Sequence, residues 1–193
     1  MKNYIFILIL IVLFSCKEQT KYKFVTDEKT DLFILTNNSD SIKITKNKKP
    51  KLFFALDPEC PLCKSYSTKI NDIYMMYQNM IDFYGFFPSP VFSSKKINNF
   101  IDKSELKMPV FIDTNQVLTY FLDAKVTPEC FFLNNKLNVI YQGLIDDRVK
   151  ALGRTSQNTQ NNYLINAIES YLKDEQPKTN KTNAIGCIIE RLP

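Results

Sequence analysis

The spacing of hydrophobic positions changes several times along the chain, and each change predicts a different kind of element. Residues 4–14 are an unbroken apolar run that ends in an abruptly polar stretch. Two strand-like pieces follow at Leu32–Thr36 and Ser41–Thr45, joined by turn residues at 37–40. From residue 51 onward, short apolar runs alternate with segments of helical periodicity, which indicates an α/β fold.

The alternating region begins with Lys51–Leu56, whose continuous apolar run predicts a central strand buried on both faces. An apolar stripe with spacings of three and four then predicts a helix over residues 62–80. The remaining predictions are strand Ile81–Phe87, helix 93–103, strand Pro109–Asp113, helix Gln116–Asp123, a hairpin of Thr127–Leu133 with Lys136–Gln142, a polar loop over 145–160, helix Asn162–Lys173 and a polar tail.

The N-terminal apolar run is too short to cross a membrane, because its eleven residues span only ~16 Å as a helix against a bilayer core of ~30 Å. Lys2 precedes the run, and Leu13–Cys16 closes it in a pattern that resembles a bacterial lipobox. We therefore expect a signal peptide at 1–15, a lipidated Cys16 and a tether over 16–23. A buried helix and a secreted leader with a free cysteine are the alternatives.

The lipobox interpretation places the protein in the bacterial cell envelope, lipid-anchored and periplasmic or surface-facing. Disulfides persist in that compartment, so pairs of cysteines can be oxidised there. We expect one domain over 24–175 and a C-terminal tail over 176–193.

Composition narrows the chemistry more than it narrows the fold. The 193 residues are 45% hydrophobic, which suffices for a packed core, and the net charge of +5 is not gathered on a basic helix, so no nucleic acid is expected as a partner. The chain has no histidine, which excludes imidazole bases and His-ligated metals. It has five cysteines, and these make thiol chemistry the candidate function.

Two of the cysteines form a Cys-x-x-Cys motif, Cys60-Pro61-Leu62-Cys63, between the buried strand and the following helix. Free N–H groups and the dipole at a helix start stabilise a thiolate, and Pro61 suits the first turn because it needs no N–H partner there. Cys60 is therefore the expected attacking thiol and Cys63 the resolving one. The same spacing also occurs in structural disulfides and zinc half-sites.

The segment Val126–Glu129 lies at the start of a later strand, ahead of a hairpin and a terminal helix, and this order resembles the thioredoxin-like fold. The resemblance implies an α/β three-layer sandwich with a central mixed sheet, here with an N-terminal strand extension. It also implies a cis peptide bond before Pro128, facing the redox pair, with Thr127 contacting a polypeptide substrate. A proline that simply opens a strand is the alternative.

Four segments look like the redoxin branch related to the alkyl hydroperoxide reductase/thiol-specific antioxidant group: 53–63, 126–133, 143–148 and Gly186–Cys187. The chain departs from that group by lacking the Pro and the Thr or Ser that precede a peroxidatic cysteine. It also lacks the Trp that thioredoxins usually carry before the first cysteine of the motif. Dithiol exchange is thus favoured over peroxidase chemistry.

Two acidic residues, Glu59 and Glu129, flank the motif and the proline, so both are expected to tune the thiol. Negative charge near Cys60 would raise its pKa against the opposing charge of Lys64. A less stabilised thiolate disfavours the reduced form and predicts a reductase. In the alternative, both carboxylates are solvated and leave the pKa of Cys60 unchanged.

The other two cysteines of the mature chain are possible extra thiols. Cys130 is expected either as a small buried hydrophobe or as a residue pointing to the active site. Cys187, in a tail expected to be mobile, could pair with Cys130, resolve as an extra thiol or stay free. A zinc site from four cysteines and a copper carrier using methionines such as Met76 are weak alternatives, and we expect neither a metal nor any cofactor beyond the redox-active disulfide.

The sequence predicts an extracytoplasmic thiol–disulfide oxidoreductase, acting as a reductase on disulfide-bearing proteins. We expect a monomer that receives electrons from another dithiol protein, because no nucleotide or flavin motif is present. A peroxiredoxin-like antioxidant peroxidase and a non-enzymatic lipoprotein with a structural disulfide are the alternatives.

Overall fold

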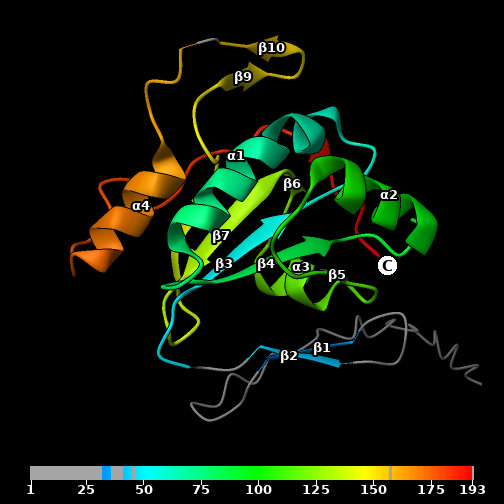
Figure 1. Ribbon diagram of the computed structural model, residues 1–193, viewed down its shortest axis with the longest axis horizontal. Coiled ribbons are helices and arrows are strands. Elements are labelled where there is room, and N and C mark those ends of the chain that lie inside the picture. The colour runs from blue at the N-terminus through cyan, green and yellow to red at the C-terminus, as the bar shows by residue number, and fades with distance from the viewer. Residues whose placement is uncertain (1–31, 36–40, 45–46, 157, 193) are drawn as a thin grey trace, which may run out of the picture.

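The structure is a computed structural model that describes residues 32–35, 41–44, 47–156 and 158–192. Its centre is a five-stranded sheet with strand order β5-β4-β3-β7-β8 (Figure 1). The strands β3, β4 and β5 are parallel, whereas β7 is antiparallel to β3 and to β8. Their bounds are β3 Lys51–Ala55, β4 Asp82–Phe87, β5 Val110–Ile112, β7 Glu129–Leu133 and β8 Val139–Gly143.

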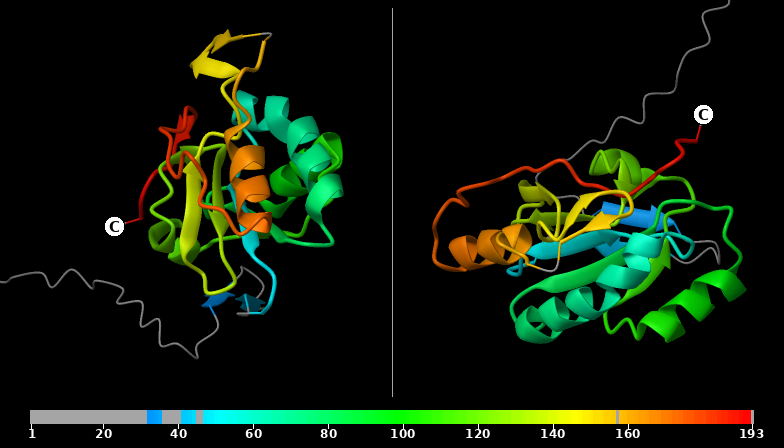
Figure 2. Two further views of the ribbon diagram at one scale, coloured as in Figure 1. Left: turned by 90° about the vertical axis from the view of Figure 1, so that its left-hand side faces the viewer. Right: turned by 90° about the horizontal axis from the view of Figure 1, so that it is seen from above.

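Helices cover both faces of this sheet, which makes three layers (Figure 2). Helices α1 (Pro61–Tyr77), α2 (Ser94–Ser104) and α4 (Tyr163–Leu172) contribute side chains to one buried cluster. The short helix α3 (Val117–Phe121) contributes to the cluster on the other face. The predicted thioredoxin-like sandwich with a central mixed sheet is confirmed.

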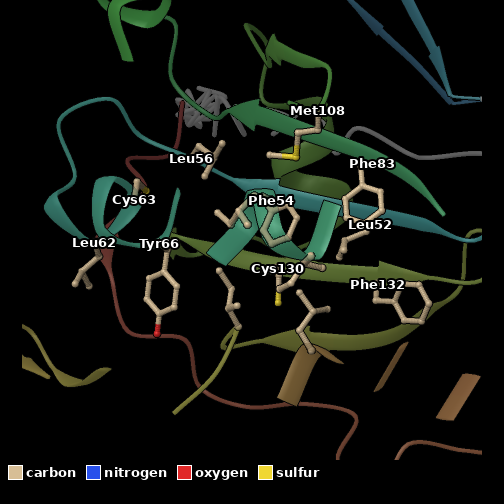
Figure 3. Close-up of a cluster of buried hydrophobic side chains, with 14 of the residues drawn as sticks. Leu52, Phe54, Leu56, Leu62, Cys63, Tyr66, Phe83, Met108, Cys130 and Phe132 are labelled. Atoms are coloured by element: carbon tan, nitrogen blue, oxygen red, sulfur yellow. The ribbon is translucent and has the colours of Figure 1, made fainter. Parts of the chain in front are cut away.

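Strand β3 explains why the sheet needs helices on both sides. Leu52 and Phe54 point into the cluster with α1, α2 and α4, as Figure 3 shows, while Phe53 and Ala55 point into the cluster with α3. All four side chains are fully buried. The prediction of a strand buried on both faces is therefore confirmed, because each alternate residue meets a packed layer.

Lys51 begins β3 and is buried, although a lysine is costly to bury without partners. Its ammonium donates to the Asn47 side chain at 2.6 Å, to the Lys49 carbonyl at 2.9 Å and to the Asp82 carboxylate at 3.0 Å. Asp82 begins the neighbouring strand β4, opposite Lys51. The ion pair of the buried Lys51 with Asp82 thus links the start of β3 to the start of β4.

Three local differences from the sequence prediction have physical causes. The predicted strand Thr127–Leu133 is divided into β6 (Val126–Thr127) and β7, because Pro128 has no N–H to donate to a ladder. The predicted loop over 145–160 contains a small antiparallel pair, β9 (Val149–Ala151) with β10 (Arg154–Thr155). The β8 strand begins later than predicted, since residues 134–138 make a turn closed by the Asn134 side chain.

The predicted N-terminal strands are present as an antiparallel pair, β1 (Leu32–Leu35) with β2 (Ser41–Ile44). Ile44 is buried in the cluster with α3, so this extension packs on that face of the sheet. The predicted leader at 1–15, Cys16 and the tether lie outside the described residues. Within the described ranges, every helix is too short or too polar to cross a membrane.

The C-terminal segment is hydrogen-bonded to β8 and paired with β6, so the expectation of a mobile tail is wrong. The backbone of Gln142 in β8 accepts from Thr182 at 2.9 Å and donates to Asn180 at 3.0 Å. Further along, β11 (Cys187–Ile188) pairs antiparallel with β6. The segment that ends the chain is thereby brought beside the strand that precedes Pro128 (Figure 1).

Candidate active site

The turn between β3 and α1 positions the Cys-x-x-Cys motif. The Asp57 carboxylate accepts hydrogen bonds from the backbone N–H groups of Glu59 at 2.6 Å and Cys60 at 3.2 Å. Cys60 is the N-cap residue of α1, with extended backbone angles, and Pro61 occupies the first turn. The chain thus leaves a buried strand and presents a thiol at a helix N-terminus, where partial positive charge favours a thiolate.

The two thiols of the motif have opposite electrostatic environments. Cys63 is fully buried, and its sulfur accepts a hydrogen bond from the Asp57 N–H at 3.4 Å. A hydrogen bond from the Cys63 thiol, aided by one from Cys187, outweighs burial and lowers the pKa of Cys60 to about 4. Burial, followed by the contact with the charged Cys60, raises the pKa of Cys63 well above its ordinary value. An attacking thiol and a resolving thiol need this asymmetry.

The peptide bond between Thr127 and Pro128 is cis. Thr127 is buried, and its carbonyl oxygen lies 3.1 Å from the Cys60 sulfur, which donates a hydrogen bond to it when Cys60 is protonated. The structure therefore places the segment before Pro128 against the redox pair. Residues 67 positions apart in the chain thus meet beyond the end of β3 and the start of β7, which are neighbours in the sheet.

A third thiol joins the site. The Cys187 sulfur lies 2.7 Å from the Cys60 sulfur. Burial and the contact with Cys60 raise the pKa of Cys187 to about 12, so it is the protonated partner and donates to the Cys60 thiolate. Sequence reasoning included Cys187 among possible extra thiols but missed its position. The available signal was an apolar run, Ile188–Ile189, directly after Gly186–Cys187 in an otherwise polar tail.

The predicted rise in the pKa of Cys60 is not found: its pKa is lowered, and neither Glu59 nor Glu129 is among the causes. Glu59 is exposed and pairs with Lys96 of α2 at 2.6 Å. Glu129 is buried, and its carboxylate accepts hydrogen bonds from the Lys125 N–H at 2.9 Å and the Gln142 amide at 3.1 Å. Both carboxylates have partners of their own, so the hydrogen bonds from the two neighbouring thiols decide the pKa of Cys60.

Cys130 lies on β7 inside the cluster with α1, α2 and α4 (Figure 3). It is fully buried, and its thiol donates to the Gly143 carbonyl at 3.2 Å. Burial raises the pKa of Cys130 well above its ordinary value. Of the two environments predicted for Cys130, the core is the one observed. A pairing with Cys187 is not observed, because Cys187 contacts Cys60 instead.

Metal ligands are not assembled at this site or elsewhere in the described ranges. Within residues 47–156 and 158–192, no group of three or more Cys, Asp or Glu side chains is arranged to hold a metal ion. Met76, considered with the motif for a copper carrier, is about half exposed on α1.

Comparison with known proteins identifies the fold. No protein-family model and no curated protein sequence matches the chain. A hypothetical protein from Sinorhizobium meliloti superposes with a TM-score of 0.71 at 16% identity, covering 84% of this chain and 92% of that one. An uncharacterized conserved protein from Geobacillus kaustophilus superposes with a TM-score of 0.70 at 16% identity, covering 86% and 92%.

A candidate thioredoxin from Neisseria meningitidis superposes with a TM-score of 0.51 at 15% identity, covering 61% of this chain and 79% of that one. Together with the strand order, these matches give the class: the chain has a thioredoxin-like fold. Its cysteine motif lies at the start of α1, and a cis-proline segment faces it.

Proposed function

We propose that this protein is an extracytoplasmic thiol–disulfide oxidoreductase that exchanges disulfides with proteins through Cys60 and Cys63. One observation carries the proposal. Cys60 caps the N-terminus of α1, with the buried Cys63 three residues further along the helix, and its sulfur lies 3.1 Å from the Thr127 carbonyl oxygen beside the cis bond before Pro128. This arrangement provides a stabilised nucleophile, a resolving thiol and a backbone edge for an extended polypeptide.

In the direction that reduces a substrate disulfide the exchange has two steps, and oxidation of a substrate dithiol is the same two steps in reverse. The Cys60 thiolate attacks one sulfur of a substrate disulfide, and the other substrate sulfur leaves as a thiolate that takes up a proton. Cys63 then loses its proton and attacks Cys60, which releases the second substrate thiol and leaves a Cys60–Cys63 disulfide. The charge of Cys60 contributes to the raised pKa of Cys63, so Cys63 becomes easier to deprotonate once Cys60 is in the mixed disulfide.

The direction of exchange follows from the stability of the thiolate. A Cys60 pKa of about 4 favours the reduced dithiol, which shifts the couple toward an oxidant. The argument for a reductase rested on Glu59 and Glu129, and their carboxylates are engaged elsewhere. We therefore propose a couple less reducing than that of thioredoxin, which has a potential of ~−270 mV.

The proposed location rests on the sequence. The lipobox-like Leu13–Cys16 supports lipid anchoring in the cell envelope, where disulfides persist. The proposed substrate is a protein whose cysteines exchange with the Cys60–Cys63 pair. The second partner is a dithiol protein that exchanges electrons with the Cys60–Cys63 pair. We propose that the chain works as a monomer.

The test is the reduction potential of the full chain, measured in graded dithiol buffers by acid quenching, alkylation and mass mapping of each cysteine. We expect a Cys60–Cys63 couple between ~−270 and ~−120 mV. The Cys60→Ser variant is the matched control and should show no such couple. A bridge that stays closed throughout this range would indicate a structural disulfide. Rapid peroxide consumption with Cys60 trapped as a sulfenic acid would indicate a peroxidase.

A further inference from the structure

The C-terminal segment occupies the edge that the proposed function assigns to a polypeptide substrate. In the antiparallel pair of β11 with β6, Cys187 lies opposite Thr127 and Ile188 lies opposite Val126. The pairing continues with a hydrogen bond from the Ile189 N–H to the Lys125 carbonyl at 2.9 Å. The chain's own residues therefore form a short strand along the segment that precedes Pro128.

The fit of this strand depends on a glycine. A Cβ atom on Gly186 would overlap the carbonyl oxygen of Thr127 and lie 2.7 Å from its carbonyl carbon. Since these are backbone atoms of a paired strand, they cannot turn aside as a flexible side chain would. A residue with no side chain is thus required directly before Cys187 for the thiol to reach the site.

The two residues after Cys187 differ in their environments. Ile189 is buried in the cluster with α3, whereas Ile188 is 83% exposed. Successive side chains of a strand point to opposite faces, so Ile189 is buried as an anchor while Ile188 points into solvent. The same alternation is seen when a peptide strand is added to the edge of a sheet. The segment thus has a close-fitting glycine, a thiol at the reactive sulfur and a buried apolar anchor.

We propose that residues 186–189 act as a tethered polypeptide substrate, and that Cys187 exchanges with the Cys60–Cys63 disulfide. The Cys187 sulfur, as a thiolate, attacks the Cys60 sulfur. The Cys60–Cys187 bond forms, the Cys60–Cys63 bond breaks, and the Cys63 thiolate takes up a proton in place of the one that Cys187 lost. The number of disulfides is unchanged, so the step needs no external oxidant or reductant.

This inference rests on the proposed function, because the Cys60–Cys63 disulfide has to form first. It also defines the substrate class. An external substrate would be an extended segment with its cysteine opposite Thr127, a glycine directly before that cysteine and an apolar residue two positions after it. Such a segment competes with Cys187, whose tether gives it an effective concentration on the order of millimolar.

The first experiment traps the exchange in the full chain. Wild-type protein and the Cys63→Ser variant are treated with oxidised glutathione, acid-quenched, alkylated and mapped by mass spectrometry. In the variant, glutathione first attaches to Cys60, and Cys187 then displaces it as reduced glutathione. We expect the Cys60–Cys187 disulfide as the main product. Cys60 bearing glutathione beside a fully alkylated Cys187 would overturn the proposal.

The second experiment tests whether docking of the strand, and not merely the presence of a thiol, drives the exchange. Gly186→Ala and Ile188→Ala are compared, each in the Cys63→Ser background. We expect Gly186→Ala to slow formation of Cys60–Cys187 by about tenfold or more, because the thiol loses its effective concentration. Ile188→Ala, which alters only an exposed side chain, should leave the rate unchanged. Equal rates in the two variants would refute the tethered-substrate role.

The wild-type map separates the two hypotheses. A Cys60–Cys63 disulfide that forms and exchanges while Cys187 stays alkylated overturns the inference and leaves the proposed function standing. A map with Cys60–Cys187 but no Cys60–Cys63 disulfide under any buffer overturns both. Both disulfides in equilibrium, with their ratio shifted toward Cys60–Cys63 by Gly186→Ala, is the expected result.

Discussion

The low pKa of Cys60 should depend on the thiol three residues away. The largest contribution is the hydrogen bond that Cys63 donates to the Cys60 thiolate. The change Cys63→Ala removes the donor, whereas Cys63→Ser keeps a hydroxyl donor at the same position. The two variants therefore differ mainly in whether the Cys60 thiolate has this partner.

The size of the effect follows from the strength of one such bond. A hydrogen bond to a charged group contributes about 1.5–3 kcal/mol, and about 1.4 kcal/mol corresponds to one pKa unit. Removal of the Cys63 thiol should raise the pKa of Cys60 by about 1–2 units, from about 4 to about 5–6. Cys60 would still be a thiolate at neutral pH, so the effect should appear only in acidic buffer.

The assay is the rate of alkylation of Cys60 by iodoacetamide as a function of pH, read by mass spectrometry on the peptide that carries it. The pKa values of Cys63 and Cys187 are both raised, so both stay protonated and neither should react in acidic buffer. We expect the midpoint of the rate profile to rise for Cys63→Ala and to stay near the wild-type value for Cys63→Ser. Identical midpoints in the alanine and serine variants would refute the hydrogen-bond explanation.

Three further predictions concern stability, each read by denaturant unfolding. Burial opposes the ionisation of Asp82, but hydrogen bonds from the Asn47 amide and the Lys51 ammonium hold the pKa of its carboxyl below the usual value. The free energy of unfolding of the wild type should therefore fall as the pH drops below 3.8, and it should fall less in Asp82→Asn. Tyr66→Phe removes the 2.6 Å hydrogen bond from the Tyr66 hydroxyl to Asp146 and should lower the free energy of unfolding by about 1–3 kcal/mol. A variant as stable as the wild type would contradict a buried hydrogen bond at this position. Ile168→Ala should cost about 2–5 kcal/mol, because the side chain is fully buried, and should leave the reduction potential unchanged.

The sheet and its helices could be predicted from the sequence because each element carries a local pattern. The run Lys51–Leu56 is short and continuous, and the stripe from Leu62 to Tyr77 has helical spacing. Cys60 at the start of α1 follows from these two patterns alone. The buried state of Lys51 could not be predicted in this way, since its partners come from a preceding loop and from the adjacent strand.

Sequence adjacency failed for the acidic residues because a neighbouring position does not fix the direction of a side chain. Glu59 directly precedes Cys60, yet its carboxylate reaches Lys96, which lies 37 residues away on another helix. Asp57, two residues earlier, turns inward and accepts the N–H groups of the loop. The local charge at the thiol is therefore set by the turn geometry, which no spacing rule reports.

The C-terminal strand escaped prediction for a different reason: its contacts are largely made by backbone groups. Pairing between β11 and β6 involves two residues on each side, too few to leave an alternating pattern in the sequence. The side-chain contacts of the segment are made with distant parts of the chain: Cys187 reaches Cys60, and Arg191 pairs with Asp123. So short a ladder contributes little stability by itself, since a strand gains stability from each added residue pair. The residues after it are held separately, Arg191 by Asp123 and Leu192 by the Gln116 side chain. Under the proposed function, a longer polypeptide displaces the two residue pairs at this edge, while the contacts of Arg191 and Leu192 keep the displaced segment close to the site.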